Sequence, residues 1–223
     1  MLRIFIGYDK NESVAAYVLA HSIHKRSSMP VSITFLNREN LRGVYDRPKG
    51  EFDSTDFSNS RFIVPYLCNY EGYAVFMDCD MLCLGDVAEF ANFMTVHTRW
   101  TQSVHVVKHK HVPKEETKFL GAIQTKYEKK NWSSVMVFNN AMCRELTVDA
   151  VNKKPGLWLH QFGWTDRVGG LPAEWNCLVG QPLGEKPPKL IHYTEGTPCF
   201  DAYKDCEFSD LWHAEREDMI SHA

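Results

Sequence analysis

Short apolar runs alternate with amphipathic and polar stretches over the first third of the chain. Residues 3–7, 31–36 and 73–77 are rich in β-branched and aromatic side chains, a composition that predicts three strands. Residues 12–26, between the first two runs, have apolar side chains at helical spacing, and Asn11 is positioned to be the N-cap. The expected apolar stripe is Val14, Ala15, Val18 and Leu19. This alternation of strand and helix predicts an α/β fold with a mainly parallel central sheet and helices on both faces.

The remaining pattern is less regular. Residues 37–59 are polar with glycine and proline and predict a long loop, and a helix should follow with Ser58 as its cap. Pro65 inside that helix removes a hydrogen bond and predicts a break or a short first turn. Asp86 and Glu89 have the spacing of a capping box. Further strands are expected at residues 103–107 and 134–138, and an amphipathic helix at 210–223.

Composition narrows the class of protein. The 223 residues suggest one domain spanning 1–223, and 44% hydrophobic residues suffice for a sizeable core. A net charge of -3 without a long basic block argues against nucleic-acid binding, and no apolar run approaches the roughly 20 residues that span a bilayer. The seven cysteines are scattered and odd in number, which favours reduced thiols in a cytoplasmic protein.

The stretch "AVFMDCDMLC" carries the strongest chemical signal. Asp78 and Asp80 follow an apolar strand and, two residues apart, present both carboxylates to the same side. Two carboxylates so close repel unless a cation or a proton lies between them. Oxygen ligands suit Mg²⁺ or Mn²⁺, and Mg²⁺ fills its remaining positions with water and substrate phosphates. The pair therefore indicates a metal-bound diphosphate at the carboxyl end of the third strand, where ligands bind in α/β sheets.

Three functions remain compatible with this pair. The metal could neutralise a nucleoside diphosphate leaving a sugar, or Asp78 could attack a phosphate as in D-x-D phosphohydrolases. Leu82 and the late position of the motif, after some 75 residues, favour the sugar reaction over the second function. The third function is a sugar-nucleotide binder without catalysis.

Beyond this pair, seven short motifs occur in an order that resembles the GT-A glycosyltransferases. The likeness is to small bacterial and phage members related to family 8, a retaining group that includes glycogenin and lipopolysaccharide galactosyltransferases. It covers most of the chain. The motifs are "IFIGYD", "FSNSRFIVPYL", "VFMDCDMLCLGDVAEF", "NWSSVMVFN", "LHQFGW", "LPAEWN" and "IHYTEGTP". The resemblance implies a GT-A, Rossmann-like fold and a metal-dependent glycosyltransferase that uses a nucleotide sugar, most simply UDP-linked, and retains the anomeric configuration.

The resemblance also implies a metal site. Asp78 and Asp80 would bind the ion, and His192 of "IHYTEGTP" would be its third protein ligand. Because imidazole suits Mn²⁺ better than Mg²⁺, Mn²⁺ is the first choice of cofactor and Mg²⁺ the second.

Donor binding and catalysis follow from the same motifs. The nucleotide turn would be Gly7, Tyr8 and Asp9, and Arg61 would bridge to the donor sugar or to the D-x-D carboxylates. The remaining donor-binding residues would be Cys79, Ser133, Ser134 and His160. Catalysis would depend on Gln161, near the anomeric carbon, together with Asp80 and Arg61.

Some positions depart from the family pattern. His160 stands where the family has aspartate, and Thr197 and Cys199 stand where it often has lysine and tryptophan. Lys204 is therefore a candidate for the second cation facing the diphosphate. Trp158, Trp164 and Trp175 are either core residues or a sugar-stacking platform, with Trp164 and Trp175 favoured for stacking.

The expected partners are a UDP-sugar donor and an acceptor that is a carbohydrate, a lipid or a protein. The C-terminal helix either packs on the domain or mediates a homodimer.

Overall fold

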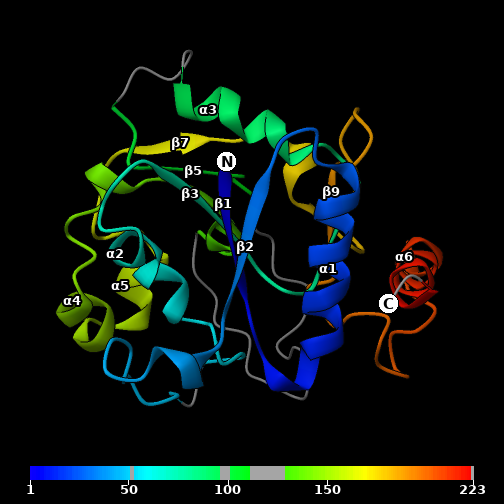
Figure 1. Cartoon of the computed structure of the whole chain (residues 1–223), viewed down its shortest axis with the longest axis horizontal. Helices are drawn as coiled ribbons and strands as arrows, with labels where there is room; N and C mark the ends of the chain where they lie inside the picture. The colour runs from blue at the N-terminus through cyan, green and yellow to red at the C-terminus, as the bar shows by residue number, and fades with distance from the viewer. Residues whose placement is uncertain (51–52, 96–100, 111–128, 222–223) are drawn as a thin grey trace.

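The computed structural model describes the chain except for residues 51–52, 96–100, 111–128 and 222–223 (Figure 1). Its main feature is a six-stranded sheet in the order β2-β1-β3-β6-β5-β7, beside a small sheet in the order β4-β9-β8. The strands are β1 (Leu2–Gly7), β2 (Val31–Leu36), β3 (Tyr73–Met77), β4 (Met81–Cys83), β5 (Val104–Val106), β6 (Val135–Asn139), β7 (Val168–Gly170), β8 (Cys177–Leu178) and β9 (Leu190–His192).

The large sheet is mostly parallel, as predicted. Strand β1 pairs in parallel with both β2 and β3, and β5 pairs in parallel with β7, whereas β6 runs antiparallel to β3 and β5. In Figure 1 helix α1 lies on one side of β1 and β2, and helices α2, α4 and α5 lie on the other. The α-helices are α1 (Ser13–Arg26), α2 (Val64–Leu67), α3 (Asn92–Thr95), α4 (Val148–Lys153), α5 (Gly156–His160) and α6 (Ser209–Ser221).

Several short 3₁₀ helices connect these elements. They are η1 (Lys10–Glu12), η2 (Arg38–Leu41), η3 (Ser60–Ile63), η4 (Val87–Ala91), η6 (Trp132–Ser134), η7 (Asn140–Met142) and η8 (Ala173–Trp175). The break predicted at Pro65 is confirmed, because η3 ends just before α2 and Pro65 lies in the first turn of α2. Among the described residues, no helix has the length and apolar character needed to cross a bilayer.

Two of the expected helix caps are wrong. Asp9, not Asn11, caps the turn before α1: its Oδ1 accepts a hydrogen bond from Asn11 N at 2.9 Å. Ser58 does not cap η3, because its hydroxyl oxygen accepts a hydrogen bond from Thr55 N instead, at 3.0 Å. Aspartate, asparagine and serine side chains accept hydrogen bonds from backbone N–H groups in turns as well as at helix ends. The local sequence therefore does not decide whether such a residue caps a helix or stabilises a turn.

The capping box at η4 is half correct. Asp86 Oδ1 accepts from Ala88 N at 2.9 Å, as predicted, but the Glu89 carboxylate forms an ion pair with Lys189. On α1, Ala15, Val18 and Leu19 are buried, whereas Val14 is 40% exposed and lies outside the apolar stripe.

The structure decides between the two interpretations of the tryptophans. Trp164 and Trp175 are buried among other aromatic rings, so they are core residues and do not form a sugar-stacking platform. Trp212 of α6 is also fully buried, and it packs with Ala15 and Val18 of α1 and with residues of the small sheet. Helix α6 is thereby packed on the domain. All seven cysteines are free thiols, and four of them are buried.

Candidate active site at the carboxyl edge of the sheet

The functional motifs meet at one edge of the large sheet. Because β1, β2 and β3 are parallel, their carboxyl ends lie at the same edge. Strand β6 is antiparallel to β3, with Met77 opposite Val135, so η6 and the start of β6 reach this edge as well. "GYD" after β1, "DCD" after β3 and "WSS" before β6 are therefore neighbours. This is the edge at which the sequence predicted ligand binding.

The three predicted metal ligands are brought together. Strands β4 and β9 pair antiparallel with Met81 opposite His192, which carries the histidine to the D-x-D segment across more than a hundred residues. His192 Nε2 lies 3.3 Å from Asp80 Oδ1 and 3.9 Å from Asp78 Oδ2. The ligand atoms of all three residues are within 4.8 Å of one another. Such a group can hold one ion.

A relay of two asparagines orients His192. Asn131 has a left-handed φ of 62°, and its carbonyl accepts a hydrogen bond from Asn176 Nδ2 at 3.2 Å. The amide of Asn176 therefore turns its Oδ1 toward His192 Nδ1, at 2.9 Å. Since Oδ1 only accepts, Nδ1 carries the proton and, in the neutral ring, Nε2 presents its lone pair to the two carboxylates. A fixed tautomer of this kind is typical of metal-bound histidines.

The surroundings fit a cation. Asp9 and Glu12 add two more buried carboxyl groups near Asp78 and Asp80. The pKa of Glu12 is raised to about 9, first by burial and then by the charges of Asp80, Asp9 and Asp78. Burial and the same carboxylates raise the pKa of the Cys79 thiol. An aspartate pair, a histidine lone pair and an excess of carboxylates match the ligands of Mn²⁺ or Mg²⁺.

Arg61 is held against the D-x-D segment. One of its nitrogens, Nη1, lies 2.8 Å from Asp78 Oδ1 and donates to the Ser133 carbonyl at 2.9 Å. The guanidinium also lies 5.3 Å and 5.0 Å from the ring centroids of Phe57 and Phe76. Of its two expected contacts, the structure contains the one to the D-x-D carboxylates. Gly7 is required nearby, because a Cβ atom there would lie 2.4 Å from the Phe57 ring.

The predicted sugar-pocket residues form a second polar group. Ser133 Oγ lies 2.8 Å from His160 Nδ1, and the His160 ring packs edge-on against Phe62. Burial, and then the charge of Arg61, lower the pKa of His160 to about 3, so the imidazole is neutral. Ser134 contributes through its backbone, since its carbonyl accepts from Asp78 N at 2.9 Å.

Two other predicted residues lie at the margins of this group. Gln161 follows His160 with an exposed side chain, and its backbone carbonyl accepts from Lys129 Nζ at 2.8 Å. Cys79 is fully buried, with its Sγ 4.0 Å from Glu12 Oε2, so its side chain faces the start of α1.

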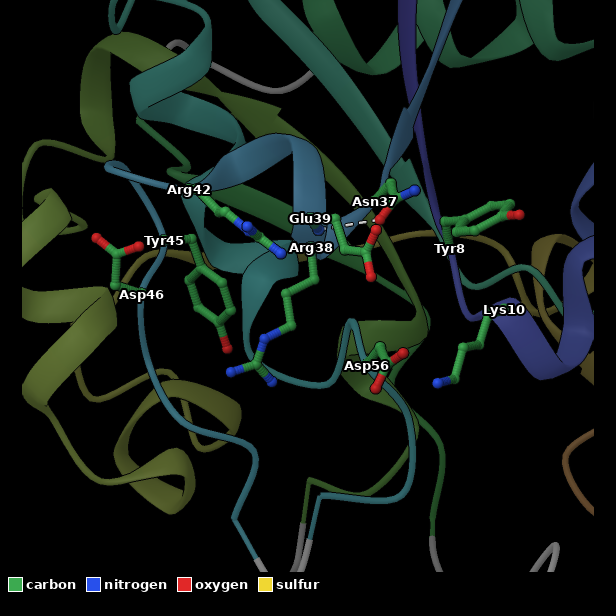
Figure 2. A pocket seen from close by; sticks show the side chains of 9 residues that line it. All are labelled: Tyr8, Lys10, Asn37, Arg38, Glu39, Arg42, Tyr45, Asp46 and Asp56. Carbon is green, nitrogen blue, oxygen red and sulfur yellow. Dashed lines mark hydrogen bonds between the residues drawn. The ribbon is translucent and has the colours of Figure 1, made fainter.

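A cavity of about 680 Å³ opens beside the nucleotide turn. Figure 2 shows Tyr8 on one side and Arg38 and Tyr45 on the other, with Lys10 and Asp56 also at the cavity. Asp9 stabilises the cavity residue Asp56, because Asp9 Oδ2 accepts a hydrogen bond from Asp56 N at 3.0 Å. The structure therefore exposes Tyr8 to the cavity but uses both carboxylate oxygens of Asp9 to hold the turn.

The motif "IHYTEGTP" and the residue after it have Thr197 and Cys199 where the family often has lysine and tryptophan, and Lys204 was the candidate for the second cation facing the diphosphate. Thr197 is buried, with its hydroxyl 2.8 Å from Cys199 Sγ. Lys204 is exposed, and its carbonyl is bonded to His213. Two residues of the site were missed by the sequence reasoning, Glu12 and Asn176. Asn176 ends the motif "LPAEWN", which could have suggested it, whereas Glu12 had no signal apart from its place after the first strand.

Solved structures with this fold are glycosyltransferases of the GT-A type. The bifunctional glycosyltransferase WbbM superposes with a TM-score of 0.66 at 17% identity over 96% of this chain and 49% of that one, so the chain spans about half its length. The galactosyltransferase LgtC, solved with donor and acceptor sugar analogues, superposes with a TM-score of 0.62 at 13% identity, over 97% of this chain and 96% of LgtC. GlyE of Streptococcus pneumoniae superposes with a TM-score of 0.64 at 13% identity, over 97% of this chain and 61% of GlyE. The chain has the GT-A fold, and the resemblance to family 8 is confirmed at this level.

A closer relative in sequence is Protein CDI of Arabidopsis thaliana. It is 44% identical over 227 residues, which cover 97% of this chain and 86% of that protein. The chain therefore belongs to the family of Protein CDI. No known family profile matches the chain.

Proposed function

We propose that this chain is a metal-dependent glycosyltransferase that moves a sugar from a UDP-sugar to an acceptor hydroxyl with retention of configuration. The observation that carries the proposal is the cluster of Asp78, Asp80 and His192, with His192 oriented by Asn176, at the ligand-binding edge of a GT-A fold. The UDP group and retention come from the motif resemblance. A homodimer and a cytoplasmic location stay predictions of the sequence.

The donor would lie along the sheet edge. Its nucleoside fits the cavity at Tyr8, after β1, and its diphosphate fits the aspartate pair after β3. Phe57 packs on Gly7, Arg61 contacts Asp78, and the guanidinium of Arg61 lies 5.3 Å from the centroid of the Phe57 ring. A bound Mn²⁺ or Mg²⁺ would supply Lewis-acid stabilisation of the leaving diphosphate.

The chain's own residues would position the reacting groups. Arg61 holds Asp78 in place through a contact of 2.8 Å between its Nη1 and Asp78 Oδ1. Neutral His160 fixes the Ser133 hydroxyl at the predicted sugar pocket, and Gln161 would lie near the anomeric carbon. The acceptor hydroxyl would attack from the side on which the diphosphate leaves, which preserves the configuration.

Ligand-dependent stability tests the donor assignment. UDP with Mn²⁺ should raise the melting temperature more than GDP, ADP or CMP does, and EDTA should remove the effect. A ligand at a hundredfold excess over Kd adds about 2.7 kcal/mol to the free energy of unfolding. A larger shift with GDP would refute the uridine assignment.

A turnover assay separates the three candidate functions. UDP release from a panel of UDP-sugars, with Mn²⁺, would support the transferase. Phosphate release from generic esters, lost in Asp78→Asn, would support the phosphohydrolase. Tight UDP binding with no turnover of any donor would support the binder.

A further inference from the structure

A third region of the same edge lies beyond the metal cluster. The sheet order β2-β1-β3-β6-β5-β7 places the nucleoside cavity at β1 and β2 and the aspartate pair at β3. The carboxyl ends of β5 and β7 and the start of β6 lie further along the same edge. A donor that spans from the cavity to the metal cluster leaves this third region for a second substrate.

Two lysines meet one aromatic ring in this region. Lys108 follows β5, Lys129 precedes η6, and their ammonium nitrogens lie 5.7 Å and 5.9 Å from the ring centroid of Trp132. The ring is fixed, because Trp132 Nε1 donates to the His109 carbonyl at 2.9 Å. We call Lys108, Lys129 and Trp132 the lysine–tryptophan site.

The two ammonium groups retain hydrogen-bonding capacity. Lys108 donates to the Val168 carbonyl and Lys129 to the Gln161 carbonyl, each at 2.8 Å. An ammonium has three N–H donors, so each keeps two for a ligand. In the part of the chain that the structure describes, neither lysine forms an ion pair with a carboxylate. Both ammonium groups are therefore available to an anionic group on a ligand that reaches Trp132.

This site is connected to the metal cluster by short links. Asn131, next to Trp132, accepts from Asn176, which orients His192. The carbonyl of Ser133, the residue after Trp132 in the sequence, accepts a hydrogen bond from Arg61 Nη1. Lys129 holds the backbone of Gln161, the residue proposed near the anomeric carbon. An acceptor bound on Trp132 would therefore be close to the reacting centre.

We infer that the acceptor carries an anionic group, a carboxylate or a phosphate, which binds Lys108 and Lys129 while its ring or chain packs on Trp132. This inference rests on the proposed function and adds the chemical class of the acceptor. The donor diphosphate is the less suitable occupant, since its proposed place is the aspartate pair that follows β3, and β3 lies between the strands at the cavity and those at the lysine–tryptophan site.

The test compares charged and neutral acceptors of the same shape. UDP release from the active UDP-sugar is measured with Mn²⁺ for two pairs: methyl glucuronide against methyl glucoside, and glycerol 3-phosphate against glycerol. At least one anionic member should accelerate UDP release, with a KM about tenfold or more below that of its neutral partner. The pair that responds tells whether the group is a carboxylate or a phosphate.

Variants then assign the effect to the two lysines. Lys108→Gln should raise the KM for the anionic acceptor about tenfold and leave the KM for the neutral partner unchanged. Lys129→Gln should raise the KM for the anionic acceptor about tenfold relative to that for the neutral partner, since an effect through Gln161 would be common to both acceptors. Lys129→Arg should restore much of the loss. Lys153→Gln is the matched control, because Lys153 is an exposed lysine of α4 paired with Asp149.

Four outcomes would overturn the inference. The first is equal response to charged and neutral acceptors, and the second is no response to any of the four. The third is unchanged KM for the anionic acceptor in both lysine variants. The fourth is weaker UDP–Mn²⁺ binding in those variants without acceptor, which would assign the lysines to the donor diphosphate. Failure of the wild-type protein to bind UDP or to release it from any donor would instead refute the proposed function, on which the inference depends.

Discussion

In the part of the chain that the structure describes, two clusters each combine two carboxyl groups with one histidine. Asp78, Asp80 and His192 meet at the sheet edge, and His21, Glu215 and Asp218 meet between α1 and α6. In both clusters the possible ligand atoms lie within 4.8 Å of one another. Distance and ligand type therefore do not distinguish them.

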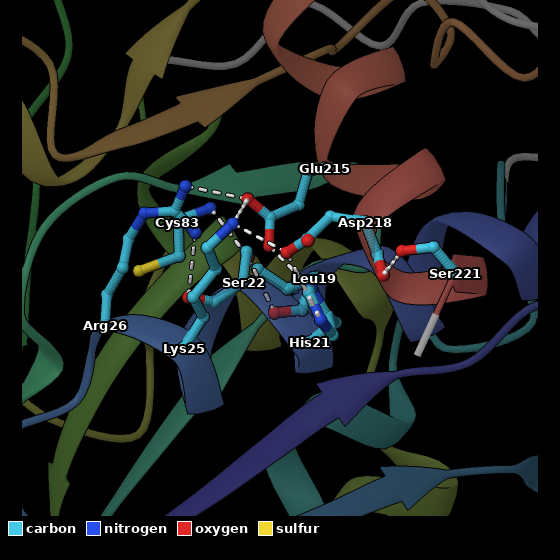
Figure 3. A network of polar contacts seen from close by, with 9 residues as sticks. All are labelled: Leu19, His21, Ser22, Lys25, Arg26, Cys83, Glu215, Asp218 and Ser221. Atoms are coloured by element: carbon cyan, nitrogen blue, oxygen red, sulfur yellow. Dashed lines mark hydrogen bonds and ion pairs between the residues drawn. The ribbon is translucent and has the colours of Figure 1, made fainter. Parts of the chain in front are cut away.

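Their surroundings differ in charge. Between α1 and α6, Glu215 contacts His21 at 2.6 Å and Arg26 at 2.7 Å, and Asp218 contacts Lys25 at 2.6 Å (Figure 3). The protein's own cations thus occupy the positions that an ion would take.

At the sheet edge, Arg61 contacts Asp78, but Asp9 adds a further carboxylate, and the charges of Asp80, Asp9 and Asp78, after burial, help to raise the pKa of Glu12 to about 9. The comparison teaches that a metal site depends on charge balance around the ligands. The cluster of His21, Glu215 and Asp218 joins α1 to α6, whereas the cluster at the sheet edge is suited to a divalent ion.

The largest effect is expected for Asp80→Asn. The amide keeps the shape of the side chain and loses its charge, so Mn²⁺-dependent stabilisation by UDP and donor turnover should both be abolished. Asp218→Asn is the control from the other cluster and should keep both. Thermal shift and UDP release measure the two properties. Turnover that survives Asp80→Asn would contradict the assignment of the metal site.

Asn176→Ala should weaken Mn²⁺ binding by about 10- to 100-fold, the usual effect of removing a group that orients a metal ligand. His192 would lose the partner that fixes its tautomer. Asn140→Ala is a matched control, because Asn140 is a buried asparagine whose amide donates to the Glu71 carbonyl away from the site. Mn²⁺ titrations of both variants, followed by melting temperature in the presence of UDP, provide the comparison. Equal affinities would show that the asparagine relay is not needed for metal binding.

The sequence predicted local features of the fold and site well and tertiary ones poorly. The three strands before the aspartates follow from apolar runs, and the edge position of Asp78 and Asp80 follows from the strand that precedes them. The place of His192 came only from family resemblance, since the pairing of β4 with β9 is non-local. Glu12 and Asn176 join the site through contacts between distant segments, for which the local pattern carries no signal.

The errors have the same cause. Asp9 and Asn11 are both good caps, and Asp9 is the one used because its second oxygen also binds Asp56 N, far along the chain. The choice between core and surface for Trp164 and Trp175 was left open by the sequence for the same reason, because their burial depends on the packing of segments that lie apart in the chain.

Glu215→Gln addresses the helix-joining cluster. Glu215 is 3% exposed, but its partners are partly solvated, so the free energy of unfolding should fall by only about 1 kcal/mol. For a chain of this size that lowers the melting temperature by about 2–4 °C. Mn²⁺ affinity should not change. A loss of Mn²⁺ binding in this variant would mean that the two clusters are coupled.

The smallest effect is expected for Lys25→Gln. Lys25 contacts Asp218 at 2.6 Å, yet the two side chains are 47% and 32% exposed. Solvent and salt screen such a pair, and ordering two long side chains costs entropy, so the free energy of unfolding should change by no more than about 0.5 kcal/mol. Urea unfolding at low and high salt measures this, and the difference from wild type should shrink further at high salt. A loss above about 1 kcal/mol would show that Lys25 is a main support of the α1–α6 contact, with Arg26 no longer the principal cation facing Glu215.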